Sequence, residues 1–527
     1  MGKVIRFAPP SEPPPSDGER RELVLKAGEL HIAIEALETA LLEANAPIFR
    51  RAGRLVAPHV EVVTGTLVNA IHRRVFLYPV ETQSIREIVS RYVKVLRLDA
   101  RKNGLVEVDL PKDIAALLAE RAVNGRLRKI NGVLNAPTLG PDWNIIDRPG
   151  YDLASGLYLD ALPDMEPIPD FPSREQAEDA LALLKDLLAE FPFANPESLS
   201  VALSGLITPV CAGAVQFAPL HGITAAAPGT GKSYLAQLGA LIAYGAQIPV
   251  TGANDKIEDE LPKQLTAALL NGERFILLDN INGELDNSLL CQAVEQKVVS
   301  VRLLGKSQNV ACPAGGFWAA TGNNLELAGD LKRRSVLCEL ARDEERPERH
   351  VFRNDPAAMI LAERGLYVRA VLTIVRAYVA AGKPSPLPPI ASYPDWNVIR
   401  SALVWLGEAD PCVSMERICE LDGSLLEFEA LLAGWLELDS ALIGLTVREL
   451  IEASRPAERF RLREALETIA SGRDGGISTQ RLGYLLRTMR DRVFRITRDD
   501  GSTLCVKLEA HMTHGKTNRW LLRLLPK

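Results

Sequence analysis

The order of apolar and polar positions changes character several times along the chain. From Leu30 to Asn45 apolar residues recur every three to four positions, which predicts an amphipathic helix. Similar patterns predict helices over Ile85–Leu96 and 110–122. Trp143–Leu159 predicts two short strands joined by a Pro-Gly turn. The pattern over 21–160 therefore predicts an α+β domain.

The rest of the chain has different patterns. Between 177 and 385, helix-period segments alternate with short apolar runs, as in parallel sheets covered by helices. Residues 395–445 predict a helical segment, and 446–527 predict short helices followed by strands. Residues 1–20, rich in Pro, Ser and acidic residues, predict a disordered arm. The expected fold class is α/β, with an α+β domain before the core and a helical domain after it.

Composition restricts the class of protein. Hydrophobic residues make up 47% and charged residues 24% of the 527 positions, and the net charge is −6, which is ordinary for a globular protein. No apolar run reaches the roughly 18 residues of a membrane span, and the N-terminus lacks the apolar stretch of a signal peptide. The seven cysteines form no CxxC pair, which favours reduced thiols over disulfides or zinc. We expect a cytoplasmic protein without a membrane partner.

Basic residues gather at the C-terminal end. From Ser478 to Lys527 there are eleven Lys and Arg against four Asp and Glu, a local charge of +7, so the remaining chain carries −13. A basic segment attached to an acidic body predicts a polyanionic partner for that segment.

The clearest chemical motif is AAPGTGKS, from Ala226 to Ser233, between the apolar stretch HGITA and the helical pattern YLAQLGALIAYG. Its two glycines allow backbone N–H groups to turn toward phosphates at a helix N-terminus. Lys232 is placed to contact the β- and γ-phosphates, and the Ser233 hydroxyl to bind Mg²⁺. The predicted cofactors are therefore ATP and Mg²⁺. The predicted ATP-binding residues are Ala227, Pro228, Gly229, Thr230, Gly231, Lys232, Ser233 and Tyr234.

Three later motifs complete this pattern. RFILLDN ends in Asp279, predicted to bind Mg²⁺ together with Ser233. GFWAATGNN ends in Asn323, or failing that Asn324, which would orient the attacking water. DLKRR places two arginines before a last strand, where they suit a finger that contacts the ATP of a neighbouring subunit. The predicted catalytic residues are Lys232, Asp279, Asn280, Asn323, Arg333 and Arg334.

The order of these motifs resembles the AAA+ ATPases and, more narrowly, the superfamily 3 helicases and the replication helicases of phages and plasmids. The resemblance covers 200–345 and implies a AAA+ core, a ring that is usually a hexamer, and an arginine finger that acts in trans. Residues 137–160 resemble the stretch before the motor in phage-type primase-helicases. The N-terminal block has no primase carboxylate set, so priming is not predicted.

One position departs from this family. The second motif usually ends in Asp-Asp or Asp-Glu, whereas here Asn280 follows Asp279 and has no carboxylate to activate water. Three alternatives follow. The base comes from Glu284 or Asp286, Asn280 only positions the water and turnover is slow, or the site binds ATP without hydrolysing it. Hydrolysis is the favoured interpretation, because the other motif residues serve it.

Two segments predict contacts with DNA. Residues 298–313 alternate around a Gly-Lys-Ser turn, which predicts a hairpin that presents Arg302 and Lys306 to single-stranded DNA in the ring channel. Residues 446–527 have the dimensions of a winged helix. Its recognition-type helix would present Arg481, Arg487 and Arg490 to duplex DNA. Solvated lysine and arginine side chains are the plainer alternative for both segments.

The sequence therefore predicts an ATP-dependent ring helicase or translocase for the replication of a phage, plasmid or integrative element. One alternative is a AAA+ initiator or loader that uses ATP as an assembly switch. Another is a AAA+ protein remodeller. The hairpin lysine and the basic tail favour nucleic acid over a protein substrate, whereas Asn280 favours a switch over a motor.

Overall fold

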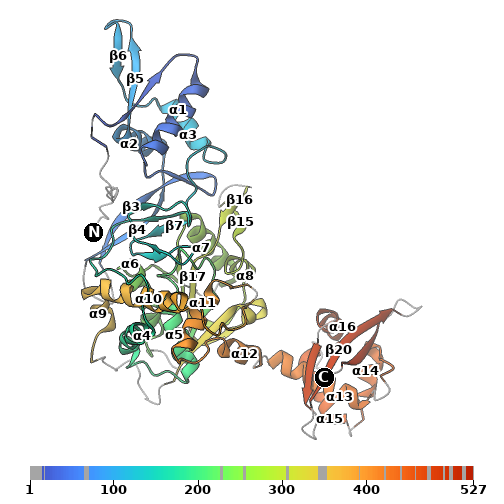
Figure 1. The fold of residues 1–527 in the computed structure, drawn as a ribbon. Coiled ribbons are helices and arrows are strands. Elements are labelled where there is room, and N and C mark those ends of the chain that lie inside the picture. Colours follow the sequence, from blue (N-terminus) through green and yellow to red (C-terminus); the bar gives the residue numbers. More distant parts are fainter. Residues whose placement is uncertain are drawn as a thin grey trace. The chain divides into compact units, whose positions relative to one another are not determined.

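The computed structural model divides the chain into two compact units, Met1–Met415 and Glu416–Lys527 (Figure 1). The structure describes residues 15–16, 18–64, 71–225, 229–252, 257–303, 308–341, 353–390, 392–420, 423–438, 442–456, 459–471, 476–490, 493–497, 503–512 and 518–525. None of the helices in these ranges is both long and apolar enough to cross a membrane.

The N-terminal part of the first unit mixes helices with two small sheets, β1-β5-β6 and β2-β3-β4. Its elements are β1 (Arg21–Leu25), α1 (Leu30–Glu43), β2 (Phe49–Arg51), β3 (Arg54–Thr64), β4 (Ile71–Pro79), α2 (Thr82–Tyr92), β5 (Val93–Asp99), β6 (Gly104–Glu107) and α3 (Lys112–Glu120). The apolar faces of β1, α1, α2, β5 and α3 share one core around Leu37, Val89 and Leu118, whereas Phe49 of β2 and Leu77 of β4 belong to a second, smaller cluster. The expected α+β character is therefore present.

Two local predictions in this part are wrong. The helix expected over Ile85–Leu96 ends at Tyr92, because β5 begins at Val93 and pairs with β1 in parallel. The Pro-Gly turn within Trp143–Leu159 does not join two paired strands. The elements there are β7 (Gly132–Leu134), β8 (Thr138–Leu139), β9 (Ile145–Ile146), β10 (Gly150–Tyr151) and β11 (Leu157–Leu159). The pairs are β8 with β9 and β10 with β11, and the second turn is held by Asp152, which accepts hydrogen bonds from Ser155.

A buried arginine ties this part to the rest of the first unit. Arg51 is 4% exposed, and its guanidinium donates to the backbone carbonyls of Ile130, Asn131, Leu269 and Pro313 at 2.7–3.2 Å. Burial lowers its pKa to about 10. Four carbonyl acceptors offset part of the cost of burying this charge.

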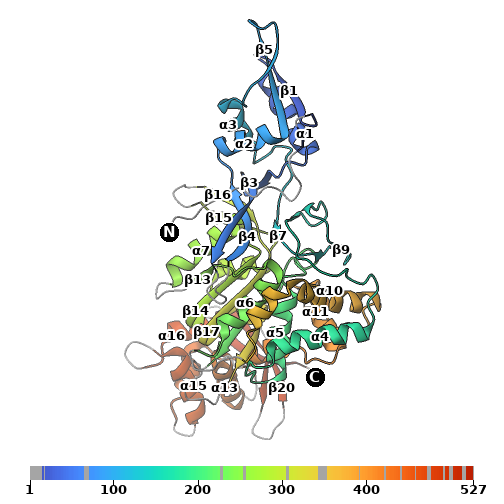
Figure 2. The ribbon, with the colours of Figure 1, turned by 90° about the vertical axis from the view of Figure 1, so that its left-hand side faces the viewer.

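The centre of the first unit is a five-stranded parallel sheet in the order β13-β14-β17-β12-β18. Strands β13, β14 and β17 of this sheet are labelled in Figure 2. Its strands are β12 (Leu220–Ala225), β13 (Val250–Gly252), β14 (Phe275–Leu285), β17 (Phe317–Leu327) and β18 (Ser335–Leu340). The helices of this region are α4 (Arg174–Leu188), α5 (Pro196–Ile207), α6 (Lys232–Tyr244), α7 (Ile257–Asn271), α8 (Ser288–Ala293), η1 (Gly329–Arg334, a 3₁₀ helix), α9 (Pro356–Ala362), α10 (Arg364–Ala380), α11 (Trp396–Trp405) and α12 (Val413–Glu420). The alternation expected over 177–385 is therefore a mixed α/β fold with a parallel sheet.

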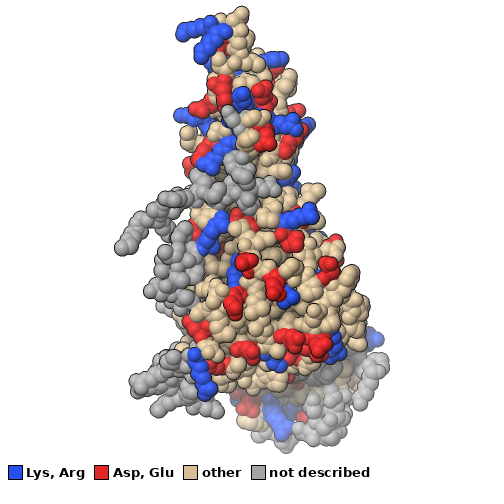
Figure 3. Space-filling model, turned by 60° about the vertical axis from the view of Figure 1, so that its left-hand side comes forward, with Lys and Arg blue, Asp and Glu red and all other residues tan. Residues whose placement is uncertain are grey.

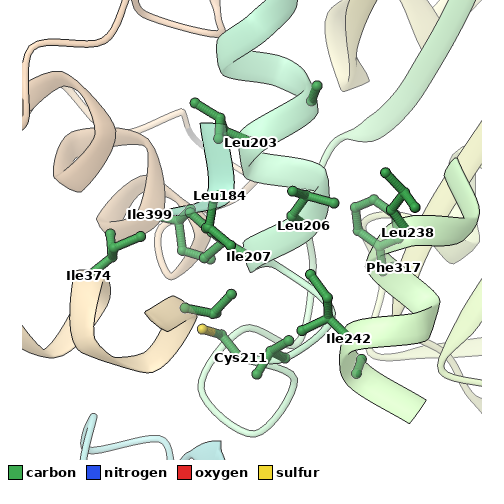
Figure 4. Packing of buried hydrophobic residues seen from close by; sticks show 14 of the residues in the cluster. Leu184, Leu203, Leu206, Ile207, Cys211, Leu238, Ile242, Phe317, Ile374 and Ile399 are labelled. Atoms are coloured by element: carbon green, nitrogen blue, oxygen red, sulfur yellow. The ribbon is translucent and has the colours of Figure 1, made fainter. Parts of the chain in front are cut away.

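The main core lies between this sheet and helices α4, α5, α6, α10 and α11, where Leu206 lies near Leu238 and Phe317, and Ile207 lies near Leu184 and Ile399 (Figure 4). Helices α5 and α6 approach closely because Gly239 has no side chain. A Cβ atom there would lie 2.6 Å from the carbonyl oxygen of Gly205.

Strands β14 and β17 turn back over the sheet after Asn280 and Asn324. Both residues are left-handed, with φ of 60° and 49°, a conformation that asparagine tolerates better than most residues. The N–H of Leu325 then donates to Thr224 Oγ1 at 3.0 Å, and Leu325 and Leu327 lie against Gly222. Both strands therefore reverse direction at the two polar motifs predicted from the sequence.

The second unit packs helices against a three-stranded antiparallel sheet, β19-β20-β21. Its elements are α13 (Gly423–Leu438), α14 (Val447–Ala453), α15 (Phe460–Ala470), α16 (Thr479–Thr488), β19 (Val493–Thr497), β20 (Thr503–Met512) and β21 (Asn518–Leu525). The core holds Phe428, Leu466, Leu486 and Trp520. The segment expected at 395–445 is thus shared, since α11 lies in the main core and α13 in this one. The proposed domain boundaries themselves stay a prediction.

Candidate active site and nucleic-acid interface

The phosphate-binding motif lies between the end of β12 and the start of α6. Gly229 and Gly231 have φ of 77° and 90°, and Gly231 is the N-cap of α6. A Cβ atom on Gly231 would also lie 3.3 Å from the Phe191 ring, so both the backbone and the packing favour glycine there. Ala227 and Pro228, two of the predicted ATP-binding residues, lie outside the described residues.

Lys232 begins α6 and points toward β17. Its ammonium donates to Asn323 Oδ1 at 2.7 Å and to Thr230 Oγ1 at 3.2 Å. Burial lowers the pKa of Lys232, and the charge of Asp279 opposes that shift. Because β17 lies between β12 and β14, with Ala225 paired to Asn323, Asn323 sits between the loop and the strand of Asp279. The predicted residues Lys232 and Asn323 are therefore brought together.

Ser233 and Asp279 form the second contact of the site. The Ser233 hydroxyl donates to Asp279 Oδ1 at 2.6 Å, and the Thr321 hydroxyl donates to the same oxygen. Within the described residues no cluster of three or more His, Cys, Asp or Glu exists that would hold a metal by itself. One hydroxyl and one carboxylate suit Mg²⁺, which prefers oxygen ligands and keeps waters and phosphates in its shell. The two residues fit the predicted cation when a nucleotide supplies the remaining oxygens.

The last predicted ATP-binding residue, Tyr234, points away from this contact. Its hydroxyl donates to Asp355 and accepts from the N–H of Ala357 at 3.0 Å. Asp355 is the N-cap of α9, so Tyr234 ties the first turn of α6 to α9.

Asn280 is exposed at the bulge that ends the flat part of β14. The left-handed backbone gives a physical reason for asparagine at this position, and aspartate tolerates the same conformation. The alternative bases Glu284 and Asp286 are carried away from the loop by the returning part of β14. Asp286 instead lies beside Gly329 of η1. The structure therefore places neither carboxylate beside Lys232 and Ser233.

Arg333 and Arg334 lie at the amino-terminal end of the parallel strands, whereas the loop lies at their carboxyl-terminal end. They end η1, and the next residue, Ser335, pairs with Leu220 at the start of β12. The loop follows Ala225, five residues further, which is about 16 Å along a strand. Arg333 is exposed and bound to Asp330 at 3.0 Å, whereas Arg334 is 11% exposed and binds Glu295 at 2.5 Å. Within one chain, neither arginine therefore lies at the end of the sheet where the loop lies.

The expected hairpin over 298–313 is present as β15 (Val298–Arg302) and β16 (Asn309–Pro313). Val299 and Val301 are buried, and Arg302 is exposed next to the turn. Lys306 lies outside the described residues.

Helix α16 of the second unit carries the other predicted contacts. Its N-cap Ser478 accepts the N–H of Arg481. Arg481, Tyr484 and Arg487 are exposed on α16, Arg490 is exposed two residues after its end, and the helix contains no acidic residue. Elsewhere, on the face seen in Figure 3, described basic and acidic side chains are interspersed.

Three residues of these sites escaped the sequence patterns. Thr321 holds Asp279, and a hydroxyl inside an otherwise apolar strand is the signal for it. Asp330 binds both arginines, and its spacing of three and four residues from them is the signal. Tyr484 is 70% exposed and lies outside the buried side of α16. Its exposure can be recognised only once it is known which side of the helix is buried.

Comparisons with known proteins give low similarity. No family model and no curated protein matches the chain. Similar solved structures include the NrS-1 C-terminal region, with 11% identity and a TM-score of 0.38 over 93% of this chain and 99% of that one. The SCCmec type IV Cch active helicase has 12% identity and a TM-score of 0.30 over 88% of each chain. The JCV helicase has 14% identity and a TM-score of 0.20 over 49% of this chain and 71% of that one. We therefore base the function on the site geometry.

Proposed function

We propose that the protein is an ATP-driven DNA helicase or translocase of the AAA+ superfamily 3 type. The observation that carries the ATPase part is the pair of contacts Lys232–Asn323 and Ser233–Asp279, at 2.7 and 2.6 Å. Lys232 binds the β- and γ-phosphates, replacing Asn323 and Thr230 as partners of its ammonium. Ser233 and Asp279 would hold Mg²⁺, which when bound would neutralise charge at the phosphates. Asn323 then offers its amide to the γ-phosphate or the attacking water.

A ring of subunits, a hexamer by resemblance, completes this site. Arg333 lies at the end of its own sheet opposite to the loop. It therefore serves as a finger only for the nucleotide of a neighbouring subunit. The β15–β16 hairpin contacts single-stranded DNA in the channel through Arg302 and Lys306. The second unit is a winged helix, in which α16 lies against duplex DNA through Arg481, Arg487 and Arg490.

A strand-displacement assay tests this function. The wild-type protein with Mg²⁺ and ATP is expected to separate a forked duplex, and Lys232→Ala protein of the same fold is expected to separate none. Wild-type protein that hydrolyses ATP without displacing a strand would contradict the motor.

One observation favours the initiator or loader as a second candidate. Asn280 supplies no base beside Asp279, and the returning part of β14 carries Glu284 and Asp286 away. A slow site of this kind suits an assembly switch. Single-turnover hydrolysis far slower than DNA binding and assembly would favour the switch over the motor.

A further inference from the structure

A chain of charged contacts runs through η1 and ends at Arg333. Its inner end is Glu295, which accepts from Ser392 Oγ on one oxygen and binds Arg334 at 2.5 Å on the other. Arg334 also binds Asp330 Oδ2 at 3.1 Å. With only 11% of its side chain exposed, Arg334 is held on two sides by carboxylates of its own chain.

Asp330 is the link between the two arginines. Its carboxylate accepts from Arg333 Nε at 3.0 Å and from Arg333 Nη2 at 3.3 Å, besides the contact with Arg334. The hydrogen bond from Arg333 and the charges of both arginines lower the pKa of Asp330. The carboxylate therefore stays ionised at neutral pH and keeps both bonds to Arg333.

This geometry leaves one edge of the Arg333 guanidinium for a ligand. The group carries five N–H bonds, and Asp330 takes the one on Nε and one on Nη2. The remaining three point away from Asp330, and the side chain is 58% exposed. A planar edge of this kind fits the oxygens of a phosphate. Asp330 thus fixes the orientation of the free edge, whereas an unpaired exposed arginine would sample many rotamers.

We propose that Asp330 is the positioning residue of the Arg333 finger. Arg334 and Glu295 hold Asp330, and Arg334 does not itself contact the nucleotide. This inference rests on the proposed trans finger. It divides the paired arginines, which the sequence does not distinguish, into one that contacts the neighbour's γ-phosphate and one that supports the contact.

Mixed rings separate this role from a general effect on folding. Arg333→Ala subunits keep their nucleotide site but lack the finger, and Lys232→Ala subunits lack turnover but keep the finger. Mixing the two restores ATPase activity where a Lys232→Ala subunit donates its finger to an Arg333→Ala subunit. Asp330→Asn is then placed either in the donor or in the acceptor of the finger, at equal protein concentrations.

We expect Asp330→Asn in the donor to lower the restored kcat at least about tenfold, since a finger is worth roughly 10³–10⁵ in kcat. The same change in the acceptor leaves kcat unchanged, and the KM for ATP is the same in both mixtures. Both mixtures contain equal numbers of subunits with the Asp330→Asn change, so a folding defect would affect them alike. Equal losses, or no loss in either mixture, would overturn the positioning role. Failure of the mixture with Asp330 intact to regain activity would overturn the trans finger itself, and the inference with it.

A double variant tests the part assigned to Arg334. Arg334→Ala in the donor is expected to lower kcat no further than Asp330→Asn does, and combining the two changes adds no further loss, because both act through Arg333. An additional loss in the double variant would show that Arg334 contacts the phosphate directly.

Discussion

At the residue scale, the hydrogen bonds of Lys232 support its proposed role in catalysis. Its ammonium is already held by Asn323 of β17, so in the proposed site phosphates replace existing partners of a positioned charge. Replacing Lys232 by Ala is expected to lower kcat for ATP at least about 100-fold, as loss of one positioned donor does. The melting temperature should stay within a few degrees of wild type. Unchanged turnover in a folded variant would contradict the phosphate-binding role.

The backbone at Asn280 makes a sharp test of water activation possible. Its φ of 60° suits Asp, whereas a Glu side chain costs roughly 1 kcal/mol there. We expect Asn280→Asp to raise kcat about tenfold or more if a missing base limits hydrolysis, since general bases contribute about 10²–10⁴. Asn280→Gly is the matched control, because glycine keeps the conformation without a side chain, and kcat should fall. A fall in both variants would show that the amide itself positions the water.

His221 connects pH to the stability of the main core. It lies on β12, where its ring contacts Phe317 with centroids 4.7 Å apart and its nitrogens meet Ser204 Oγ and the Pro219 carbonyl. Burial lowers the pKa of His221 to about 4. Between pH 4 and about 6.5 the unfolded chain binds the proton more tightly, so stability is complete above this window and is lost as pH falls through it.

The expected loss from His221 is about 3 kcal/mol across that window. Urea titrations at several pH values measure it, and the adjacent Trp396 serves as a local fluorescence probe. Other groups titrate in the same range, so the result is the difference between wild type and His221→Asn, whose profile should be flatter. Parallel profiles would mean that His221 does not control acid stability.

At the scale of elements, the sequence predicts those features of the fold that depend only on neighbouring residues. The hairpin β15–β16, the helix α16 and the start of α6 directly after Gly231 appear where the pattern places them. The helix boundary at Val93 was missed because pairing with β1, a distant strand, decides it. The insertion of β17 between β12 and β14 and the return of both long strands also depend on long-range pairing. These features bring Asn323 to Lys232 and separate Glu284 from Asp279.

Helix α16 provides the prediction for this scale. Arg487 is exposed on a helix without acidic residues, so its contact with a DNA phosphate would release counterions. Arg487→Ala should weaken binding to duplexes of any sequence and reduce the salt slope by roughly 0.9. Arg463→Ala on α15 is the control, because Glu467 already pairs with that arginine at 2.8 Å. Fluorescence anisotropy over a salt series measures both.

Removing the whole second unit should affect duplex binding in the same direction as Arg487→Ala. Deleting the second unit, 416–527, is expected to remove most duplex affinity and to flatten the salt dependence, while ATP binding at Lys232 is retained. If the deletion binds duplex as tightly as the full chain, α16 contacts protein and not DNA.

At the scale of the whole molecule, the proposed trans finger makes catalysis depend on assembly. The loop and Arg333 lie at opposite ends of the strands of one sheet, so under the proposed function an isolated subunit binds ATP but has no finger for it. Specific ATPase activity should therefore rise with protein concentration and level off as rings form. ATP binding per subunit should stay constant over the same range.

Arg333→Ala separates assembly from the finger. The variant should assemble at the same concentration as wild type, by sedimentation velocity with nucleotide, yet its specific activity should stay at the low value of dilute wild type. Asp330 remains bonded to Arg334 in that variant, so the local structure keeps its inner support. Activity that is independent of concentration in the wild type, with full turnover by single subunits, would mean that each nucleotide site is complete within its own chain.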